Sequence, residues 1–226
     1  SFAEWPEHLR RAETRDFCER ELKPLLERLD DRFMHCFGQD FGRVSDLSVL
    51  WPLEVDSKLK RNTPFVVELR NIPFEAQRDI VFYCLDRLPR FGGAAFDATG
   101  NGAYLAEVAM QRYGSGRVQQ IKMSLEFYRE NMPRYKAAFE DGTIVIPRDA
   151  DILADHRMIK SIDGVGQIPR AERAKGQDGA KRHGDAAIGG FLAYYATTMD
   201  IAVYDYASGA LPPMGSEDRA REDGED

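Results

Sequence analysis

Residues 92–102 read Gly-Gly-Ala-Ala-Phe-Asp-Ala-Thr-Gly-Asn-Gly, a run of small and apolar residues that ends in an acid and a glycine-containing turn. A nearly continuous run of this kind is typical of a short parallel strand that is covered on both faces. Apolar residues then recur at helical spacing over 102–113, which predicts a helix directly after the turn. The stretch therefore predicts a strand that ends at Asp97, followed by a helix.

The residues before this stretch predict strands that pair as an antiparallel meander. Apolar residues dominate 33–39 and 46–55, and a tight turn joins these two segments. β-Branched and aromatic residues over 63–70 predict a third strand. A helix over 74–88 then leads to the strand at 92–97.

The residues after 113 continue as alternating strands and helices. Residues 160–183 are polar and contain glycines, and we expect a loop or hairpin there. The further predicted elements are strands over 117–123 and 143–147 and helices over 125–140, 149–159 and 185–198. This order predicts an α/β fold of the ribonuclease H-like kind, a mixed sheet in which an antiparallel meander is followed by parallel strands, with helices on both faces.

The chain of 226 residues is long enough for one sizeable domain, and 43% of its residues are apolar. No linker rich in proline, glycine or serine divides the predicted elements, so we assign the ribonuclease H-like domain to residues 30–206. Residues 1–29 predict a helical lead-in, interrupted near Pro24, that packs on the domain or links it to a missing upstream domain. Residues 207–226 predict an acidic disordered tail.

Composition and motifs exclude several classes of protein. No apolar run is long enough to span a bilayer and the N-terminus lacks a signal-peptide pattern, so we expect a soluble, intracellular protein. The three cysteines form no Cys-x-x-Cys pair, which argues against structural zinc and a disulfide framework. There is no Gly-x-x-x-x-Gly-Lys-Ser/Thr sequence. Gly100-Asn101-Gly102 is a weak signal for a phosphate-binding loop, and we expect its glycines to let the chain turn sharply.

The formal charge of −7 is unevenly distributed. Residues 216–226 hold six acids and two arginines, whereas residues 169–183 hold five basic residues and two acids, a local charge of +3. Basic side chains bind DNA phosphates, so we expect the second segment to contact DNA, with a solvated loop as the alternative. The residues concerned are Arg170, Arg173, Lys175, Lys181 and Arg182, together with His183 and with Arg43 in the first tight turn.

Three aspartates lie where predicted elements begin or end. Asp40 closes the first strand, Asp97 closes the fourth, and Asp185 opens the last helix. Adjacent parallel strand ends would bring Asp40 and Asp97 together. Asp185 lies on the same face of the last helix as Ile188 and Leu192, and we expect this face to point toward the sheet. Hard divalent cations prefer such oxygen ligands. The pattern predicts a site for two Mg²⁺ or Mn²⁺ ions, one activating water and the other stabilising a leaving 3′ oxygen.

Each aspartate also has a structural interpretation. Asp185 could cap its helix, Asp40 could belong to the turn that follows it, and Asp97 could cap a strand–helix turn. Their order along the chain favours a joint metal site over three unrelated roles. Asp46, across the turn from Asp40, is a fourth candidate ligand with turn capping as its alternative. His183 could assist at the metal or contact phosphate, or be a plain loop histidine.

Three short motifs resemble the nuclease domain of the tailed-phage large terminase subunit, close to the Mu-like prophage branch. They are Gln39–Val49, Phe96–Gly102 and His183–Ala187. The resemblance covers roughly residues 30–200, and the order and the strand or helix context of the motifs make it fairly specific. It implies a ribonuclease H-like endonuclease that cuts concatemeric double-stranded viral DNA, with Asp40, Asp97 and Asp185 as the metal-binding acids.

The resemblance also implies partners and a setting. In the family an upstream ATPase motor accompanies the nuclease, and the small terminase subunit and the portal are further partners, with no membrane. The chain begins at Ser1 without such a motor, as expected of an excised fragment or processed chain. The implied location is the cytoplasm of a bacterial host during phage assembly.

Other functions agree with part of the pattern. A Holliday-junction resolvase would share the fold and the metal chemistry but act on another shape of DNA. A non-catalytic module that docks the packaging motor on portal and DNA would agree with the net negative charge but not with the three carboxylates. An actin-like ATPase would need a second, duplicated half, and no internal repeat is visible in the sequence.

Overall fold

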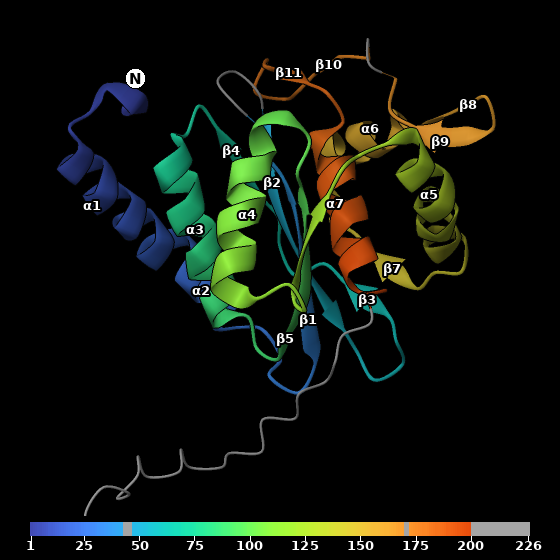
Figure 1. The fold of residues 1–226 in the computed structure, drawn as a ribbon, viewed down its shortest axis with the longest axis horizontal. Coiled ribbons are helices and arrows are strands. Elements are labelled where there is room, and N and C mark those ends of the chain that lie inside the picture. Colours follow the sequence, from blue (N-terminus) through green and yellow to red (C-terminus); the bar gives the residue numbers. More distant parts are fainter. Residues whose placement is uncertain (43–46, 170–171, 200–226) are drawn as a thin grey trace, which may run out of the picture.

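A mixed β-sheet forms the centre of the molecule, with helices on both of its faces (Figure 1). The computed structural model describes residues 1–42, 47–169 and 172–199. The strands follow the order β6-β5-β1-β2-β3-β7, and β4 also pairs with β2. Their bounds are β1 Met34–Asp40, β2 Leu47–Val55, β3 Arg61–Asn62, β4 Val67–Arg70, β5 Phe91–Asp97, β6 Val118–Ile121 and β7 Ile144–Val145.

Helices α3 and α4 cover one face of the sheet, and α5 and α7 cover the other (Figure 1). Phe37 and Leu50 belong to the core cluster on the α3–α4 side. Val49 and Trp51 pack on the other side with Phe191 of α7. The helices are α1 Glu7–Phe17, α2 Lys23–Leu26, α3 Phe74–Arg87, α4 Ala103–Tyr113, α5 Leu125–Glu140, α6 Ala150–Arg157 and α7 Asp185–Ala196. Among the described helices, none is long and apolar enough to cross a membrane.

The pairing of β1 determines where the strand ends meet. β1 runs antiparallel to β2, with Asp40 opposite Val49. On its other side β1 runs parallel to β5, with Gln39 opposite Phe96, and β5 runs parallel to β6. The predicted mixed sheet, antiparallel first and parallel afterwards, is confirmed.

Two glycines let helix α7 lie directly on the sheet. A Cβ atom on Gly38 of β1 would collide with the backbone of Gly189 and Ala193 in α7. A Cβ atom on Gly189 would lie 2.6 Å from Cγ1 of Val49, well inside van der Waals contact. The backbones of α7 and β1 therefore approach each other as closely as only glycine allows.

Only the second half of the predicted third strand at 63–70 is strand in the structure, as β4. β3 and β4 both pair with β2, but the residues between them are not strand. Pro64 lies in this gap and has no N–H to donate to a neighbouring strand, so the ladder is interrupted there. The segment predicted as a loop or hairpin contains two short hairpins: β8 Lys160–Ile162 pairs with β9 Val165–Gln167, and β10 Ala174–Lys175 pairs with β11 Lys181–Arg182.

The helical lead-in packs against the sheet domain. A π-helical turn, Cys18–Leu22, joins α1 to α2. It lies just before Pro24, which lacks the N–H that a regular helical bond would use. Leu22 and Leu26 are buried in the same core cluster as Phe37 of the sheet. The predicted acidic tail lies outside the described residues.

Candidate metal centre

Asp40 and Asp97 end two neighbouring parallel strands, β1 and β5. The pairing of Gln39 with Phe96 brings the next residue of each strand side by side. The two carboxyl groups are close enough for Asp40 to influence the pKa of Asp97. Two carboxylates this close repel each other, and a divalent cation between them would relieve that repulsion.

The surroundings of Asp97 raise the pKa of its carboxyl group. Burial is the cause, and hydrogen bonds with Thr99 and Asp40 oppose it. The backbone N–H of Thr99 donates to Oδ1 of Asp97 at 2.7 Å, so Asp97 also has the turn role that was its structural alternative. A Cβ atom on Gly102 would collide with the backbone oxygen of Asp97, which explains why a glycine follows in this turn.

Asp185 is the first residue of α7 and is 8% exposed. Gly184, with a φ of +82°, occupies the N-cap position, so Asp185 is not the helix cap. Oδ2 of Asp185 instead accepts a hydrogen bond from the backbone N–H of His183, a half-buried residue, at 3.1 Å. Burial raises the pKa of the Asp185 carboxyl group, the His183 bond opposes this, and the charge of Asp155 raises the pKa further.

Helix α7 brings Asp185 to the same end of the sheet as the strand-end pair. Gly189 of this helix lies over Val49, the residue opposite Asp40, and Asp185 is one helical turn nearer to the strand end. Figure 1 shows the start of α7 and the loop after β5 at the same, upper end of the sheet. As predicted, Ile188 packs toward the sheet from this helix.

The three aspartates lie at the same end of the sheet but do not form one closed cluster. Within the described part of the chain, no group of three His, Cys, Asp or Glu side chains is close enough to hold a metal ion. Asp40 and Asp97 meet, whereas Asp185 lies at the same end of the sheet on its own helix. Asp46, the fourth predicted ligand, lies outside the described residues. Their oxygen donors suit Mg²⁺ or Mn²⁺ better than metals that prefer sulfur or nitrogen.

Tyr128 of α5 is a neighbour of the strand-end pair that sequence reasoning missed. Burial raises the pKa of its phenol, and the negative charges of Asp40 and Asp97 raise it further. The hydroxyl group therefore stays protonated and can donate a hydrogen bond to an anionic oxygen. Tyr128 lies one helical turn before the buried Met132, and this spacing in the sequence could have indicated that its side chain faces inward.

Arg182 does not face solvent, which corrects its predicted role in DNA contact. Its side chain is 2% exposed and is held by the carboxylates of Glu68 and Asp155. Burial alone would lower the pKa of this guanidinium, but the two carboxylates outweigh it and raise the pKa. Because side chains alternate along a strand, the preceding Lys181 points the other way and is exposed.

Three of the other described residues that were predicted to contact DNA are exposed, whereas His183 is half-buried. Arg173, Lys175 and Lys181 are exposed. Lys175 and Lys181 lie directly opposite each other in the β10–β11 hairpin, where like charges repel. An anionic partner would relieve that repulsion. Arg43 and Arg170 lie outside the described residues.

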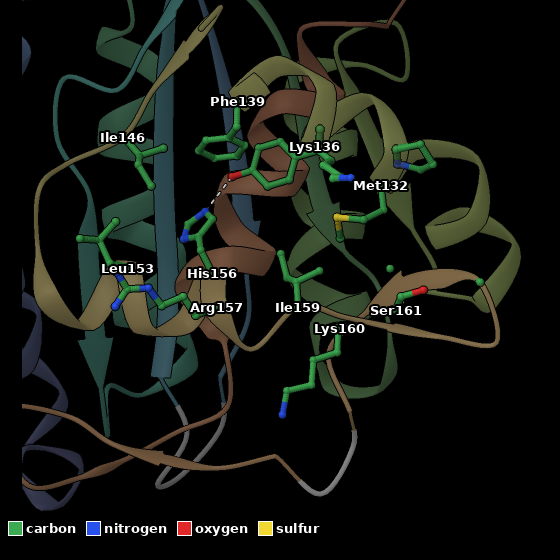
Figure 2. Close-up of a pocket in the computed structure, with 14 residues that line it drawn as sticks. Met132, Lys136, Phe139, Ile146, Leu153, His156, Arg157, Ile159, Lys160 and Ser161 are labelled. Carbon is green, nitrogen blue, oxygen red and sulfur yellow. Dashed lines mark hydrogen bonds between the residues drawn. The ribbon is translucent and has the colours of Figure 1, made fainter. Parts of the chain in front are cut away.

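A separate cavity of about 670 Å³ lies between α5, α6 and the β8–β9 hairpin (Figure 2). On its wall the side chains of Tyr135 and His156 form a hydrogen bond of 2.9 Å. Nδ1 of His156 lies 2.8 Å from the carbonyl oxygen of Ile152, which can only accept, so Nδ1 carries the proton and Nε2 accepts from the Tyr135 hydroxyl. None of the three predicted metal-binding aspartates lines this cavity, so it is not part of the candidate metal centre.

The chain is similar to two known proteins over nearly its whole length. It is 42% identical over 222 residues to the Mu-like prophage FluMu protein gp28 of Haemophilus influenzae, an alignment that covers 98% of this chain and 43% of that protein. It is 43% identical over 207 residues to the probable terminase, large subunit gp28, of Escherichia phage Mu, covering 91% and 37%. The chain thus spans less than half the length of these relatives. No family model matches it.

The fold is shared with solved nuclease domains. The large terminase nuclease from thermophilic phage G20c aligns with a TM-score of 0.53 and 16% identity, over 74% of this chain and 83% of that chain. The same nuclease has been solved with bound magnesium and with bound cobalt, at TM-scores of 0.52 and 0.54. The chain is therefore a homologue of these two gp28 proteins over the region that it shares with them, and it has the ribonuclease H-like fold that it shares with the solved large terminase nuclease.

Proposed function

We propose that the chain is a metal-dependent endonuclease that cuts double-stranded DNA during viral DNA packaging. The observation that carries this proposal is the pairing of Asp40 and Asp97 at adjacent parallel strand ends, with Asp185 at the same end of the sheet on α7. Carboxyl groups that lie this close together are a suitable setting for a divalent cation. The relationship with gp28 and the large-terminase nuclease fold support the same activity.

The residues of the site have separate roles in this proposal. Asp40 and Asp97 hold Mg²⁺ or Mn²⁺ through their carboxylate oxygens, and Asp185 completes the site from α7. When bound, a pair of such ions supplies an activated water and stabilises the leaving 3′ oxygen of the phosphodiester. The protonated hydroxyl of Tyr128 donates a hydrogen bond to a phosphate oxygen. The solved G20c nuclease with bound magnesium supports this choice of ion.

The β10–β11 hairpin provides the proposed DNA contact. The exposed cations on and beside this hairpin are Arg173, Lys175 and Lys181. Arg182, on the inner side of the hairpin, binds Asp155 and so holds the hairpin against the domain. The hairpin leads within three residues to Asp185, so phosphates bound by these cations would lie near the acids. Phosphate contacts carry no base readout, and we expect weak, largely sequence-independent affinity that falls with salt.

The remaining partners follow from the resemblance to the family. The chain covers 43% and 37% of its two gp28 relatives, so a larger protein can hold further activities. We propose an upstream ATPase motor domain, the small terminase subunit and the portal as partners. The proposed substrate is concatemeric viral DNA, and the proposed location is the cytoplasm of a bacterial host.

Cleavage of supercoiled plasmid tests the proposed function. The wild-type chain is compared with Asp40→Asn and Asp97→Asn in Mg²⁺, in Mn²⁺ and in EDTA. Asp141→Asn, an exposed acid at the end of α5, is the matched control. We expect nicking and linearisation only with metal, loss in both site variants, and wild-type behaviour of the control.

Three other outcomes would redirect the assignment. If all four proteins bind DNA and none cleaves it, the docking-module hypothesis replaces the nuclease. If all four cleave equally, the activity does not come from Asp40 and Asp97. Much faster cleavage of a four-way junction than of linear duplex would favour a junction resolvase.

A further inference from the structure

Arg182 occupies the centre of a buried network of charges at the start of α7. Its Nε and Nη2 donate to Oδ1 and Oδ2 of Asp155 at 3.0 and 2.8 Å. Its Nη1 and Nη2 donate to Oε2 and Oε1 of Glu68 at 3.0 and 2.6 Å. A carboxylate oxygen of Asp151 lies at the edge of the network, 3.9 Å from Nη1. One planar guanidinium thus holds two carboxylates, each through two hydrogen bonds.

The two carboxylates differ in what else they hold. Oδ2 of Asp155 also accepts the backbone N–H of Ala186, the second residue of α7, at 2.9 Å. Asp155 belongs to α6 and is completely buried. Glu68 belongs to β4, and its side chain is 30% exposed. Within the described residues, the side-chain bonds of Glu68 go to Arg182 alone.

This network holds the chain on both sides of Asp185. The first N–H groups of a helix have no partner inside the helix, and the Asp155 carboxylate satisfies the one that belongs to Ala186. Ala186 directly follows Asp185, and Arg182 precedes it by three residues. The segment that carries Asp185 is therefore fixed through a side chain before it and a backbone group after it.

We propose that Arg182 is a positioning residue, which acts through Asp155 to fix the first turn of α7 and thereby the direction of Asp185 toward the metal. The proposal rests on the proposed function and deepens it. Groups that orient a metal ligand from behind commonly change metal affinity or activity by about 10–100-fold when they are removed. Through β11, the same side chain also fixes the hairpin whose outward lysines would meet DNA.

Asp155→Ala and Glu68→Ala form a matched pair for testing this proposal. Each removes one of the two carboxylates of the same guanidinium, but only Asp155 reaches α7. Asp155→Asn keeps the shape of the buried side chain and serves if the alanine variant does not fold. Arg182→Lys keeps the charge but cannot hold both carboxylates in two-bonded geometry.

Three measurements separate positioning from simple stability. Mn²⁺ binding is measured by calorimetry without DNA, plasmid cleavage is measured across Mn²⁺ concentrations, and thermal unfolding is measured in EDTA. We expect the Asp155 variants to weaken Mn²⁺ binding by about tenfold or more and to shift the Mn²⁺ dependence of cleavage by the same factor. Glu68→Ala should bind Mn²⁺ with the affinity of the wild type. The Mn²⁺ affinity of Arg182→Lys should lie between those of Glu68→Ala and the Asp155 variants.

Unchanged Mn²⁺ affinity in the Asp155 variants would overturn the positioning role. A loss of Mn²⁺ affinity in all the variants, in proportion to their loss of thermal stability, would overturn it as well. A wild-type chain that neither binds Mn²⁺ nor cleaves DNA would instead overturn the proposed function, and this inference with it. The two failures are therefore distinguished by the wild type alone.

Discussion

The carboxylates at one end of the sheet form two groups that differ in what balances their charge. Asp40 and Asp97 lie against each other, and burial raises the pKa of Asp97. Glu68 and Asp155 lie against Arg182, whose guanidinium holds both. Carboxylates that meet a guanidinium already have their counter-charge, whereas carboxylates that meet each other gain from a cation.

The two groups of acids are represented within a single row of residues across the sheet. The register places Asp40, Val49 and Glu68 side by side across β1, β2 and β4. The two acids at the ends of this row stand two strands apart and have different partners. The role of an acid here follows from its partner, and substitutions in the two groups should therefore have opposite effects on folding.

The largest expected change in folding comes from Arg182→Met. It leaves Glu68 and Asp155 without counter-charge, and we expect the free energy of unfolding to fall by about 3–5 kcal/mol. Arg112→Met is the control, because the ion pair of Arg112 with Asp86 is exposed and should contribute at most about 1 kcal/mol. Urea unfolding measures both. Equal losses in the two variants would mean that the buried network contributes no more than a surface pair.

The largest expected change in catalysis comes from Asp97→Asn. We expect single-turnover cleavage to fall by about 10²–10³-fold or more, because a group that stabilises charge in the transition state is lost. The free energy of unfolding in EDTA at neutral pH should equal or exceed that of the wild type, since a buried charge is removed. A parallel loss of folding stability would show that Asp97 serves the fold in the way that Asp155 does.

Divalent metal should stabilise the wild-type chain but not Asp97→Asn. A ligand that binds only the folded state at 100 times its Kd adds about 2.7 kcal/mol to the free energy of unfolding. Thermal unfolding with and without Mn²⁺ measures this difference, with NaCl of equal ionic strength as the control. A similar Mn²⁺ effect on Asp97→Asn would place the ion elsewhere.

The pH dependence of folding should reveal the raised pKa of Asp97. A carboxyl group whose pKa is higher in the folded chain favours folding when it is protonated, and this contribution is lost as the pH rises through the folded-state pKa. Asp97→Asn cannot ionise, so in EDTA its advantage over the wild type should grow from acidic to neutral pH. Urea unfolding at several pH values tests this, and a pH-independent difference would contradict the assignment.

The smallest expected effect concerns the outer face of the hairpin. Lys181→Met should weaken DNA binding uniformly across sequences and reduce the slope of log affinity against log salt by about 1, because one phosphate contact is lost. Lys136→Met is the control, since the exposed side chain of Lys136 pairs with that of Glu140, also on α5. An unchanged slope for Lys181→Met would remove the hairpin from the proposed DNA contact.

The strand-end pair could be predicted from the sequence because it depends on local patterns. The runs that end at Asp40 and Asp97 are recognisable as strands, and parallel neighbours place their carboxyl ends together. Asp185 could be placed on a sheet-facing helix by the spacing of Ile188 and Leu192. The metal-binding roles of these acids remain predictions.

The inward turn of Arg182 could not be predicted, because a run of basic residues gives a local charge without showing which side chains face the core. The orientation of Arg182 and Lys181 is set by the register of a two-residue strand, and a shift of one residue would exchange them. That register is fixed by distant partners on α6 and β4. Asp155, an acid one turn after buried Ile152 in its helix, was the signal that an inward cation was needed.

A crystal structure with Mn²⁺, read by anomalous scattering, tests the central claim most directly. We predict anomalous peaks between the carboxylates of Asp40 and Asp97, within reach of Asp185, and no peak at Glu68 and Asp155, where Arg182 already holds both acids. The peaks should be absent in Asp97→Asn crystals grown in the same way. Mn²⁺ bound only at other acids, or peaks that persist in Asp97→Asn, would contradict the account.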